Sequence, residues 1–252
     1  MTERIIGIMG ALSEEISGVI ELLENKEEHR IGKRVYYTGT IKNQKVVVVY
    51  SRIGKVAASA TVPTLILKFG ITELIFTGVA GGISSDLKIG DIVIGTELVQ
   101  HDMDAFPLFP VYEIPLIGKS HFKSNPNLVE LSSKTIQHIF ENEYLHQVIS
   151  EEDLESFNIH HPKMHLGLIA SGDQFFRDQA QKDHLVKGLP DTLCVEMEGA
   201  AVAQVCYEFG IPFVVIRTIS DEADQHSTVD FNKFTEKISN IYSIEIIKNM
   251  IQ

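Results

Sequence analysis

Short apolar runs alternate with longer amphipathic stretches along the whole chain, and this alternation limits the folds open to it. The runs at 4–9, 73–78, 164–171 and 213–220 have the length of buried strands, and helical spacing separates them. Strands joined by helices predict an α/β fold, in which a largely parallel sheet carries helices on both faces. The other expected elements are strands at 34–41, 45–51, 90–95 and 193–197, and helices at 54–70, 126–141, 178–187, 198–209 and 231–251.

The chain length and one irregular segment define the expected domain organisation. A chain of 252 residues suits a single α/β domain over 1–252. The segment at about 100–124 is rich in aromatic residues and proline and has weak periodicity. We expect it to form a loop excursion, and long loops in compact domains are often functional.

Charge, hydropathy and cysteine content exclude several partners and compartments. The chain has 34 acidic and 22 basic side chains, with no basic run that could neutralise a phosphate backbone, so nucleic acid is not an expected partner. No segment is apolar over a membrane-spanning length. The first apolar stretch is interrupted by Ser13, Glu14 and Glu15, which argues against a signal peptide. Cys194 and Cys206 are too few for a disulfide framework, so we expect a cytoplasmic protein.

Two segments contain potential metal ligands. "HDMD" at 101–104 and "HHPKMH" at 160–165 combine histidines with acidic or basic neighbours. Neither spacing matches a zinc site. We therefore expect neither a metal nor another cofactor.

Two acidic residues interrupt the apolar stretch "LCVEMEGAAVA" at 193–203. A buried carboxylate without partners is costly, so Glu196 and Glu198 each need one. By the period of two along a strand, Glu196 faces opposite to Val195 and Met197. Glu198 begins the next helix. It could cap that helix, or it could accept two hydrogen bonds from a vicinal diol. For Glu196 the sequence indicates a supporting contact.

A further acidic residue follows the last predicted strand. Asp221 comes directly after Ser220, and Arg217 lies inside the strand. Asp221 could be a turn or capping residue. However, Glu15, Glu198 and Asp221 all stand at strand ends, where α/β sheets bind ligands. Separated carboxylates in one cleft are typical of acid–base chemistry at a sugar carbon. Arg217 could bind phosphate, but we interpret it as the partner of a carboxylate in the cleft.

Eight motifs occur in the order found in one superfamily. They are "GIMGALSEEI", "SRIGKVAA", "TGVAGGIS", "GDIVIG", "SGDQF", "VEMEGAAVAQVC", "IPFVVIRTISDEADQ" and "DFNKF". The chain is identified on these motifs as a member of the nucleoside phosphorylase/hydrolase superfamily. It resembles most the 5′-methylthioadenosine/S-adenosylhomocysteine nucleosidases, from residue 5 to about 250 apart from 104–163. The resemblance implies a three-layer α/β fold with a twisted mixed, mostly parallel sheet, a homodimer, and hydrolysis of the N-glycosidic bond of the nucleoside by water.

The resemblance also implies roles for particular residues. Glu15 resembles the base that handles the attacking water. Asp221 resembles the acid that protonates adenine at N7, with Ser220 holding its carboxyl group. An aspartate with an ordinary pKa of about 3.9 must have that pKa raised by burial to stay protonated. Glu198 resembles the residue that binds the 2′- and 3′-hydroxyls of the ribose, and Met197 the floor beneath the sugar.

The remaining matched positions line the base, sugar and tail. Phe175 resembles the ring stacked on adenine, and Phe176 a residue that contacts the base through its backbone. The sugar site includes Ala80 and Gly81. The apolar positions matched to the thioether tail are Leu12, Ile53 and Phe231. Leu12 and Phe176 differ in side chain from these relatives, which leaves tail and base preference open.

Two enzymatic alternatives and one non-enzymatic alternative stay open at this point. A nucleoside phosphorylase would need cationic groups or free N–H groups where Glu15 stands, and a carboxylate repels phosphate, so hydrolysis is favoured. An aminodeoxyfutalosine hydrolase shares the same motifs. A nucleoside-binding module without activity would bind adenine without turnover. The loop at 100–124, with Phe106, Phe109 and Tyr112, could pack at a dimer interface or form a surface loop.

Overall fold

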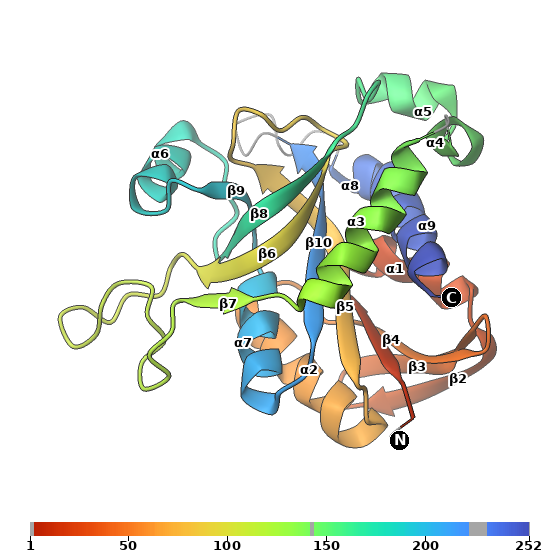
Figure 1. The fold of residues 1–252 in the computed structure, drawn as a ribbon, viewed down its shortest axis with the longest axis horizontal. Coiled ribbons are helices and arrows are strands. Elements are labelled where there is room, and N and C mark those ends of the chain that lie inside the picture. The colour runs from red at the N-terminus through yellow and green to blue at the C-terminus, as the bar shows by residue number, and fades with distance from the viewer. Residues whose placement is uncertain (1–2, 142–143, 222–230, 252) are drawn as a thin grey trace.

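A mixed β-sheet forms the centre of the molecule (Figure 1). The computed structural model describes residues 3–141, 144–221 and 231–251. Within these residues the strands are β1 (Ile6–Gly10), β2 (Glu24–Ile31), β3 (Arg34–Ile41), β4 (Gln44–Tyr50), β5 (Glu73–Gly82), β6 (Ile92–Gln100), β7 (His121–Lys123), β8 (Met164–Ser171), β9 (Thr192–Glu196) and β10 (Phe213–Asp221).

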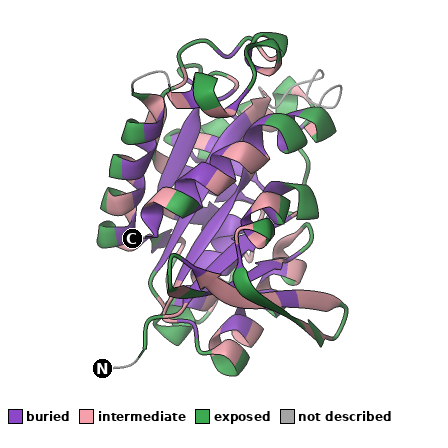
Figure 2. Cartoon of the chain, turned by 90° about the vertical axis from the view of Figure 1, so that its right-hand side faces the viewer, coloured by how far each residue is buried: buried purple, intermediate pink, exposed green. Residues whose placement is uncertain are grey.

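Helices cover both faces of this sheet. They are α1 (Ser13–Glu21), α2 (Lys55–Phe69), α3 (Pro126–Phe140), α4 (Tyr144–Val148), α5 (Glu151–Ser156), α6 (Gln179–Gly188), α7 (Gly199–Phe209), α8 (Phe231–Phe234) and α9 (Asn240–Met250), with a π-helical turn over Thr235–Ser239. Buried side chains of α1, α3 and α9 pack on one face, and those of α2 and α7 pack on the other. Figure 2 shows the resulting layers: the central strands are buried and the outer faces of the helices are exposed.

Part of the sheet closes on itself. β5 pairs with β10 and β9, β10 with β6, β6 with β8, and β8 with β9, so these five strands form a ring. β1, β4, β3 and β2 extend the sheet from β5 in that order. The predicted mixed sheet between helices is confirmed. The expectation of a mostly parallel sheet was too strong, because among the described strands antiparallel pairings are as frequent as parallel ones.

The first edge strand was missing from the predicted elements for a physical reason. β2 reads "ENKEEHRI" and pairs with β3 at the end of the sheet, where nearly all of its side chains face solvent. A strand that buries neither face has no apolar alternation to reveal it. Its charges also disfavour pairing with the edge of another sheet.

The pairing of strand ends determines where a ligand can bind. Gly81 of β5 lies opposite Asp221 of β10 on one side and opposite Val195 of β9 on the other. Ser171, the last residue of β8, lies opposite Glu196, the last residue of β9. The ends of β5, β8, β9 and β10 therefore meet at one edge of the ring, as expected for a ligand site in an α/β sheet.

Residues 101–120 extend away from the sheet between β6 and β7 (Figure 1). They contain one bridge, between Ile114 and Lys119, and otherwise neither helix nor strand. Phe106, Leu108 and Leu116 are largely exposed. Among the described residues, no helix has both the length and the hydropathy needed to cross a membrane.

Candidate active site

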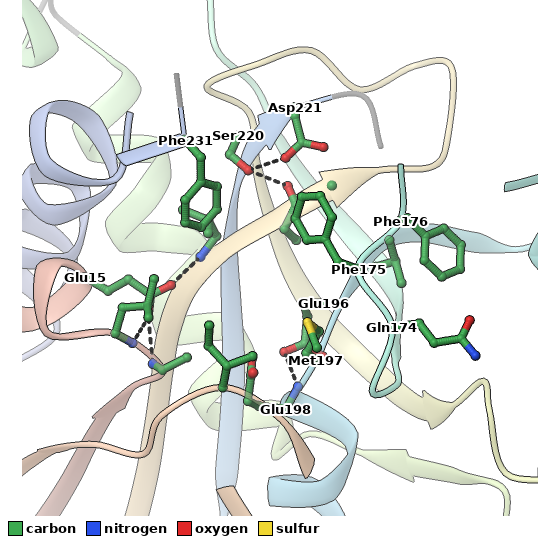
Figure 3. A pocket seen from close by; sticks show the side chains of 17 residues that line it. Glu15, Gln174, Phe175, Phe176, Glu196, Met197, Glu198, Ser220, Asp221 and Phe231 are labelled. Carbon is green, nitrogen blue, oxygen red and sulfur yellow. Dashed lines mark hydrogen bonds between the residues drawn. The ribbon is translucent and has the colours of Figure 1, made fainter. Parts of the chain in front are cut away.

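A cavity opens where these strand ends meet (Figure 3). Figure 3 shows Glu15 on one side of it, Phe175 and Phe176 on the other, with Asp221 above and Glu198 below. The structure brings nearly all of the predicted site residues to its lining: Leu12, Glu15, Ile53, Ala80, Gly81, Phe175, Phe176, Glu196, Met197, Glu198, Ser220, Asp221 and Phe231. Arg217 does not line the cavity and lies behind it, in contact with Glu196.

Backbone amides hold the carboxylate of Glu15. Its Oε2 accepts hydrogen bonds from the N–H groups of Ala11 at 2.6 Å and Leu12 at 2.8 Å, and its Oε1 accepts one from Val79 at 3.1 Å. Burial raises the pKa of Glu15 above its ordinary value; the charge of Arg217 and the three amides oppose this shift without cancelling it. The carboxylate is therefore fixed in position and more basic than an exposed glutamate.

Gly78 provides the space that this carboxylate occupies. A Cβ atom at Gly78 would lie 2.6 Å from Oε1 of Glu15 and 3.0 Å from its Cδ. Because β5 is held on both sides, Gly78→Ala should displace the carboxylate rather than the strand. For the predicted role of Glu15 as the base, we expect kcat/KM to fall about 10²-fold, since displacing a reacting group by about 1 Å costs that much. Steady-state kinetics would check this, with Gly32→Asn as the control, because nothing lies near the Cβ position of Gly32 and asparagine tolerates its φ of +60°. Wild-type kinetics in Gly78→Ala would contradict it.

Glu196 caps α7 and pairs with Arg217. Its oxygens accept hydrogen bonds from the N–H groups of Glu198 at 3.1 Å and Gly199 at 2.8 Å and from the Ser171 hydroxyl. Arg217 Nη2 donates to Glu196 Oε2 at 2.7 Å, and the guanidinium lies 4.0 Å from the centre of the Phe76 ring. Removing one partner of such a buried pair leaves an uncompensated charge. The predicted supporting position of Glu196 thus has a clear structural basis.

This arrangement leaves the Glu198 carboxyl group available to a ligand. Glu198 occupies the N-cap position of α7, but its side chain accepts no capping hydrogen bond, because Glu196 binds the free N–H groups there. Its Oε1 instead accepts from the Gly54 N–H at 2.7 Å. Burial and the nearby charge of Glu196 raise the pKa of Glu198 to about 8, against opposing effects of Arg217 and Gly54. Of the two predicted roles, side-chain capping is excluded.

The raised pKa of Glu198 predicts how stability depends on pH. The unfolded chain ionises this group near its ordinary value of 4.5 and the folded chain near about 8, so the folded state loses stability as pH rises through that range. Glu198→Gln removes this loss. We expect its unfolding free energy to exceed that of the wild type by on the order of 3 kcal/mol at pH 8 and by little below about pH 4.5. Urea unfolding of both proteins and of the exposed control Glu21→Gln would measure it. A difference in unfolding free energy between Glu198→Gln and the wild type that does not change with pH would contradict this prediction.

The opposite wall carries a hydroxyl and a carboxyl group from β10. Ser220 Oγ donates to Asp221 Oδ2 at 2.7 Å and lies 3.4 Å from the carbonyl oxygen of Ala80. Ser220 thus fixes one oxygen of the Asp221 carboxyl group. The rest of the sequence motif, residues 222–225, and Asp230 of the last motif lie outside the described residues.

Aromatic and apolar side chains form the remaining walls. The Phe175 ring is 45 % exposed, and Phe176 is buried against His101, with ring centres 5.2 Å apart. Sequence reasoning missed several contributors: the backbone amides that hold Glu15, the Gly54 N–H, Ser171, and the lining residues Ala11, Val79, Gln174 and Val195. Backbone groups leave no sequence signal. In the part of the chain that the structure describes, no group of three or more His, Cys, Asp or Glu side chains is arranged to hold a metal ion.

The fold and this cavity define an α/β protein with an acidic ligand site, and comparison with known proteins identifies the family. The phosphorylase superfamily profile matches residues 5–252, so the chain belongs to the phosphorylase superfamily. It is 36 % identical to the aminodeoxyfutalosine nucleosidase of Helicobacter pylori strain J99, over 98 % of this chain and 97 % of the relative. It is 35 % identical to the 5′-methylthioadenosine/S-adenosylhomocysteine nucleosidase of Anoxybacillus flavithermus, again over 98 % and 97 %.

A solved structure matches as extensively. The 5′-methylthioadenosine/S-adenosylhomocysteine nucleosidase of Neisseria meningitidis, in complex with methylthio-immucillin-A, superimposes with a TM-score of 0.86 at 30 % identity. The match covers 98 % of each chain. The resemblance stated from the sequence motifs is thereby confirmed for the family and the fold.

Proposed function

We propose that this protein hydrolyses the N-glycosidic bond of 5′-methylthioadenosine and S-adenosylhomocysteine, releasing adenine and the 5′-thio-substituted ribose. The observation that carries the proposal is the convergence of Glu15, Glu198 and Asp221 on one cavity. The 5′-methylthioadenosine/S-adenosylhomocysteine nucleosidases that match over almost the whole chain support the choice of substrate.

Glu15 is the base that accepts a proton from the attacking water. Its carboxylate faces the cavity and is held by three backbone amides, so it cannot rotate away from the nucleophile. Its raised pKa makes it a better proton acceptor than an exposed carboxylate. Water attacks the anomeric carbon, loses a proton to Glu15, and becomes the new hydroxyl group of the sugar.

Asp221 is the acid on the leaving-group side. Adenine leaves with the electron pair of the glycosidic bond, and a proton on N7 neutralises the charge that develops on the ring. Ser220 donates to Oδ2 of Asp221 and so orients the carboxyl group that delivers the proton to the base. Phe175 stacks on the base.

The charges around the sugar stabilise the transition state. Glu15 and Glu196 lie in or beside the cavity, and Arg217 offsets part of their charge. Glu198 adds to the negative charge as it ionises around its pKa of about 8. The sugar becomes oxocarbenium-like as the bond breaks, so an anionic surrounding favours the transition state over the neutral substrate. Glu198 accepts hydrogen bonds from the ribose hydroxyls, and Met197, Ala80 and Gly81 lie along the sugar.

Substrate turnover with and without phosphate tests the proposal against a phosphorylase. In phosphate-free buffer, pure protein should release adenine and free 5′-methylthioribose from 5′-methylthioadenosine. Phosphate should not accelerate it, because Glu15 repels a phosphate anion from the nucleophile position. Chromatography of the products decides the outcome. Turnover that requires phosphate and yields a sugar 1-phosphate would establish the phosphorylase, and adenine binding without turnover would establish a non-enzymatic binding module.

Aminodeoxyfutalosine is a second candidate substrate. The aminodeoxyfutalosine nucleosidase of Helicobacter pylori strain J99 is 36 % identical to this chain over nearly its whole length. Three apolar residues of the cavity lining, Leu12, Ile53 and Phe231, would contact the 5′ substituent. Measuring kcat/KM for both aminodeoxyfutalosine and 5′-methylthioadenosine compares the two candidate substrates directly.

The setting of the enzyme follows from its substrate and surface. The activity would serve methionine salvage and removal of methyl-transfer by-products in the cytoplasm, where thiols stay reduced; both Cys194 and Cys206 are free and buried.

A homodimer would cover the exposed apolar side chains of the loop at 100–124, such as Phe106 and Leu108, and those of α2, such as Val56. Light scattering at the monomer mass would contradict this assembly.

A further inference from the structure

Outside the cavity, one lysine joins three separate segments of the chain. Lys55, the first residue of α2, lies between Asp102 in the loop after β6 and Asp173 in the loop after β8. Its Nζ donates to Asp102 Oδ1 at 2.6 Å and its backbone N–H donates to Asp173 Oδ1 at 2.8 Å. The N–H of Asp173 donates to Asp102 Oδ2 at 2.9 Å. These contacts form a closed ring, which we call the Lys55 network.

Two of the three charged side chains of the network are largely buried, and Asp173 is half-exposed. The side chains of Lys55 and Asp102 are 16 % and 18 % exposed, so solvent screens their attraction less than it would on the surface. Partial burial raises the pKa of Asp102, but the hydrogen bonds from Lys55 and Asp173 outweigh burial and hold it below its ordinary value. Asp102 is therefore anionic at neutral pH, and its bond to the Lys55 ammonium is charge-assisted.

Two members of the Lys55 network, Asp173 and Lys55, are each next in sequence to residues of the site. Asp173 is followed by Gln174, Phe175 and Phe176, which line it. Residues 172–178 form neither helix nor strand, so side-chain and backbone contacts determine where this loop lies. Lys55 is preceded by Gly54, whose N–H donates to Glu198.

We propose that the Lys55 network positions the base-stacking loop 172–176 relative to the sugar-binding carboxylate of Glu198, which makes Lys55 and Asp102 positioning residues for nucleoside binding. This inference rests on the proposed function, since it takes Phe175 as the ring that stacks on adenine. Neither Lys55 nor Asp102 lines the cavity, so both act through the residues they hold.

Loss of the network should weaken base binding more than it slows the chemical step. The Lys55 ammonium fixes the carboxylate of Asp102, which in turn accepts the N–H of Asp173. Without the ammonium Asp102 no longer holds that N–H in one place, and the 172–176 loop samples positions in which Phe175 no longer flanks the base. The apparent affinity then falls with the fraction of molecules in the competent arrangement. The amides that hold Glu15 belong to other segments and are unaffected.

The test uses Lys55→Met, Asp102→Asn, their combination and Lys55→Arg, with Lys68→Met as the matched control on the exposed face of the same helix. KM and kcat are measured with 5′-methylthioadenosine, and the adenine Kd by calorimetry. We expect Lys55→Met and Asp102→Asn to raise KM and the adenine Kd about tenfold, the loss typical of one charge-assisted hydrogen bond, while kcat falls less than about threefold. The double variant should resemble Lys55→Met, and Lys55→Arg should recover part of the affinity.

The proposal would be overturned if the adenine Kd and the KM of Asp102→Asn were unchanged. This variant is isosteric, so it decides the question if Lys55→Met fails to fold. An unchanged KM with a lower kcat, or additive losses in the double variant, would also overturn the proposal. These outcomes are distinct from failure of the proposed function, in which the wild type itself neither cleaves 5′-methylthioadenosine nor binds adenine.

Discussion

Replacing Glu15 by glutamine should lower kcat at least about 10²-fold and leave the fold intact. Glutamine keeps the size of the side chain, and its carbonyl oxygen in the Oε2 position can still accept hydrogen bonds from the N–H groups of Ala11 and Leu12. Its NH2 group then faces the N–H of Val79, which loses its acceptor. It cannot take a proton from water. Stopped assays of adenine release from 5′-methylthioadenosine would measure the loss.

The charge change itself should not destabilise this variant. Burial raises the pKa of Glu15, which means that the ionised carboxylate is costly in the folded state. At neutral pH the gain from removing this charge offsets the cost of the unpaired Val79 N–H, so Glu15→Gln should melt close to the wild-type temperature. The exposed neighbour offers a matched control, since Glu14→Gln changes the same charge one residue away. Normal turnover in Glu15→Gln would remove its assigned role.

Most of the sheet could be predicted because its strands bury apolar residues. The run at 164–171 coincides with β8, and the run at 213–220 with β10 to within one residue. The direction of each strand was harder to predict. β9 is antiparallel to β5 but parallel to β8, because the sheet closes into a ring, and a local pattern of apolar residues contains no information about closure.

The site was predictable where chemistry required an unusual residue. Glu198 stood out because a carboxylate in an apolar run needs a partner, and the structure gives it the Gly54 N–H. That partner could not be found from the sequence, since it is a backbone group 144 residues away. Gly78 belongs to a glycine-rich segment, and a tight turn alone could account for its glycines. The close approach of Gly78 to the Glu15 carboxylate depends on how β5 lies beside β1.

Asp221→Asn should also lose at least about 10²-fold in kcat, but for a reason that depends on the leaving group. Asparagine preserves the shape and can keep the hydrogen bond from Ser220, yet it cannot deliver a proton to adenine. Adenine is a poor leaving group without that proton, so bond breaking becomes the slow step. Asp86→Asn, an exposed change in the loop after β5, serves as the control.

A substrate whose leaving group needs no proton separates the two carboxyl groups. The 5-methylthioriboside of 4-nitrophenol expels a stable anion, so Asp221→Asn should cleave it at close to the wild-type rate. Glu15→Gln should remain slow on the same compound, because water must still be deprotonated at the anomeric carbon. This crossed pattern assigns the proton donor and the proton acceptor independently of absolute rates. Equal losses for both variants on both substrates would mean that Asp221 acts by positioning the sugar and does not protonate the base.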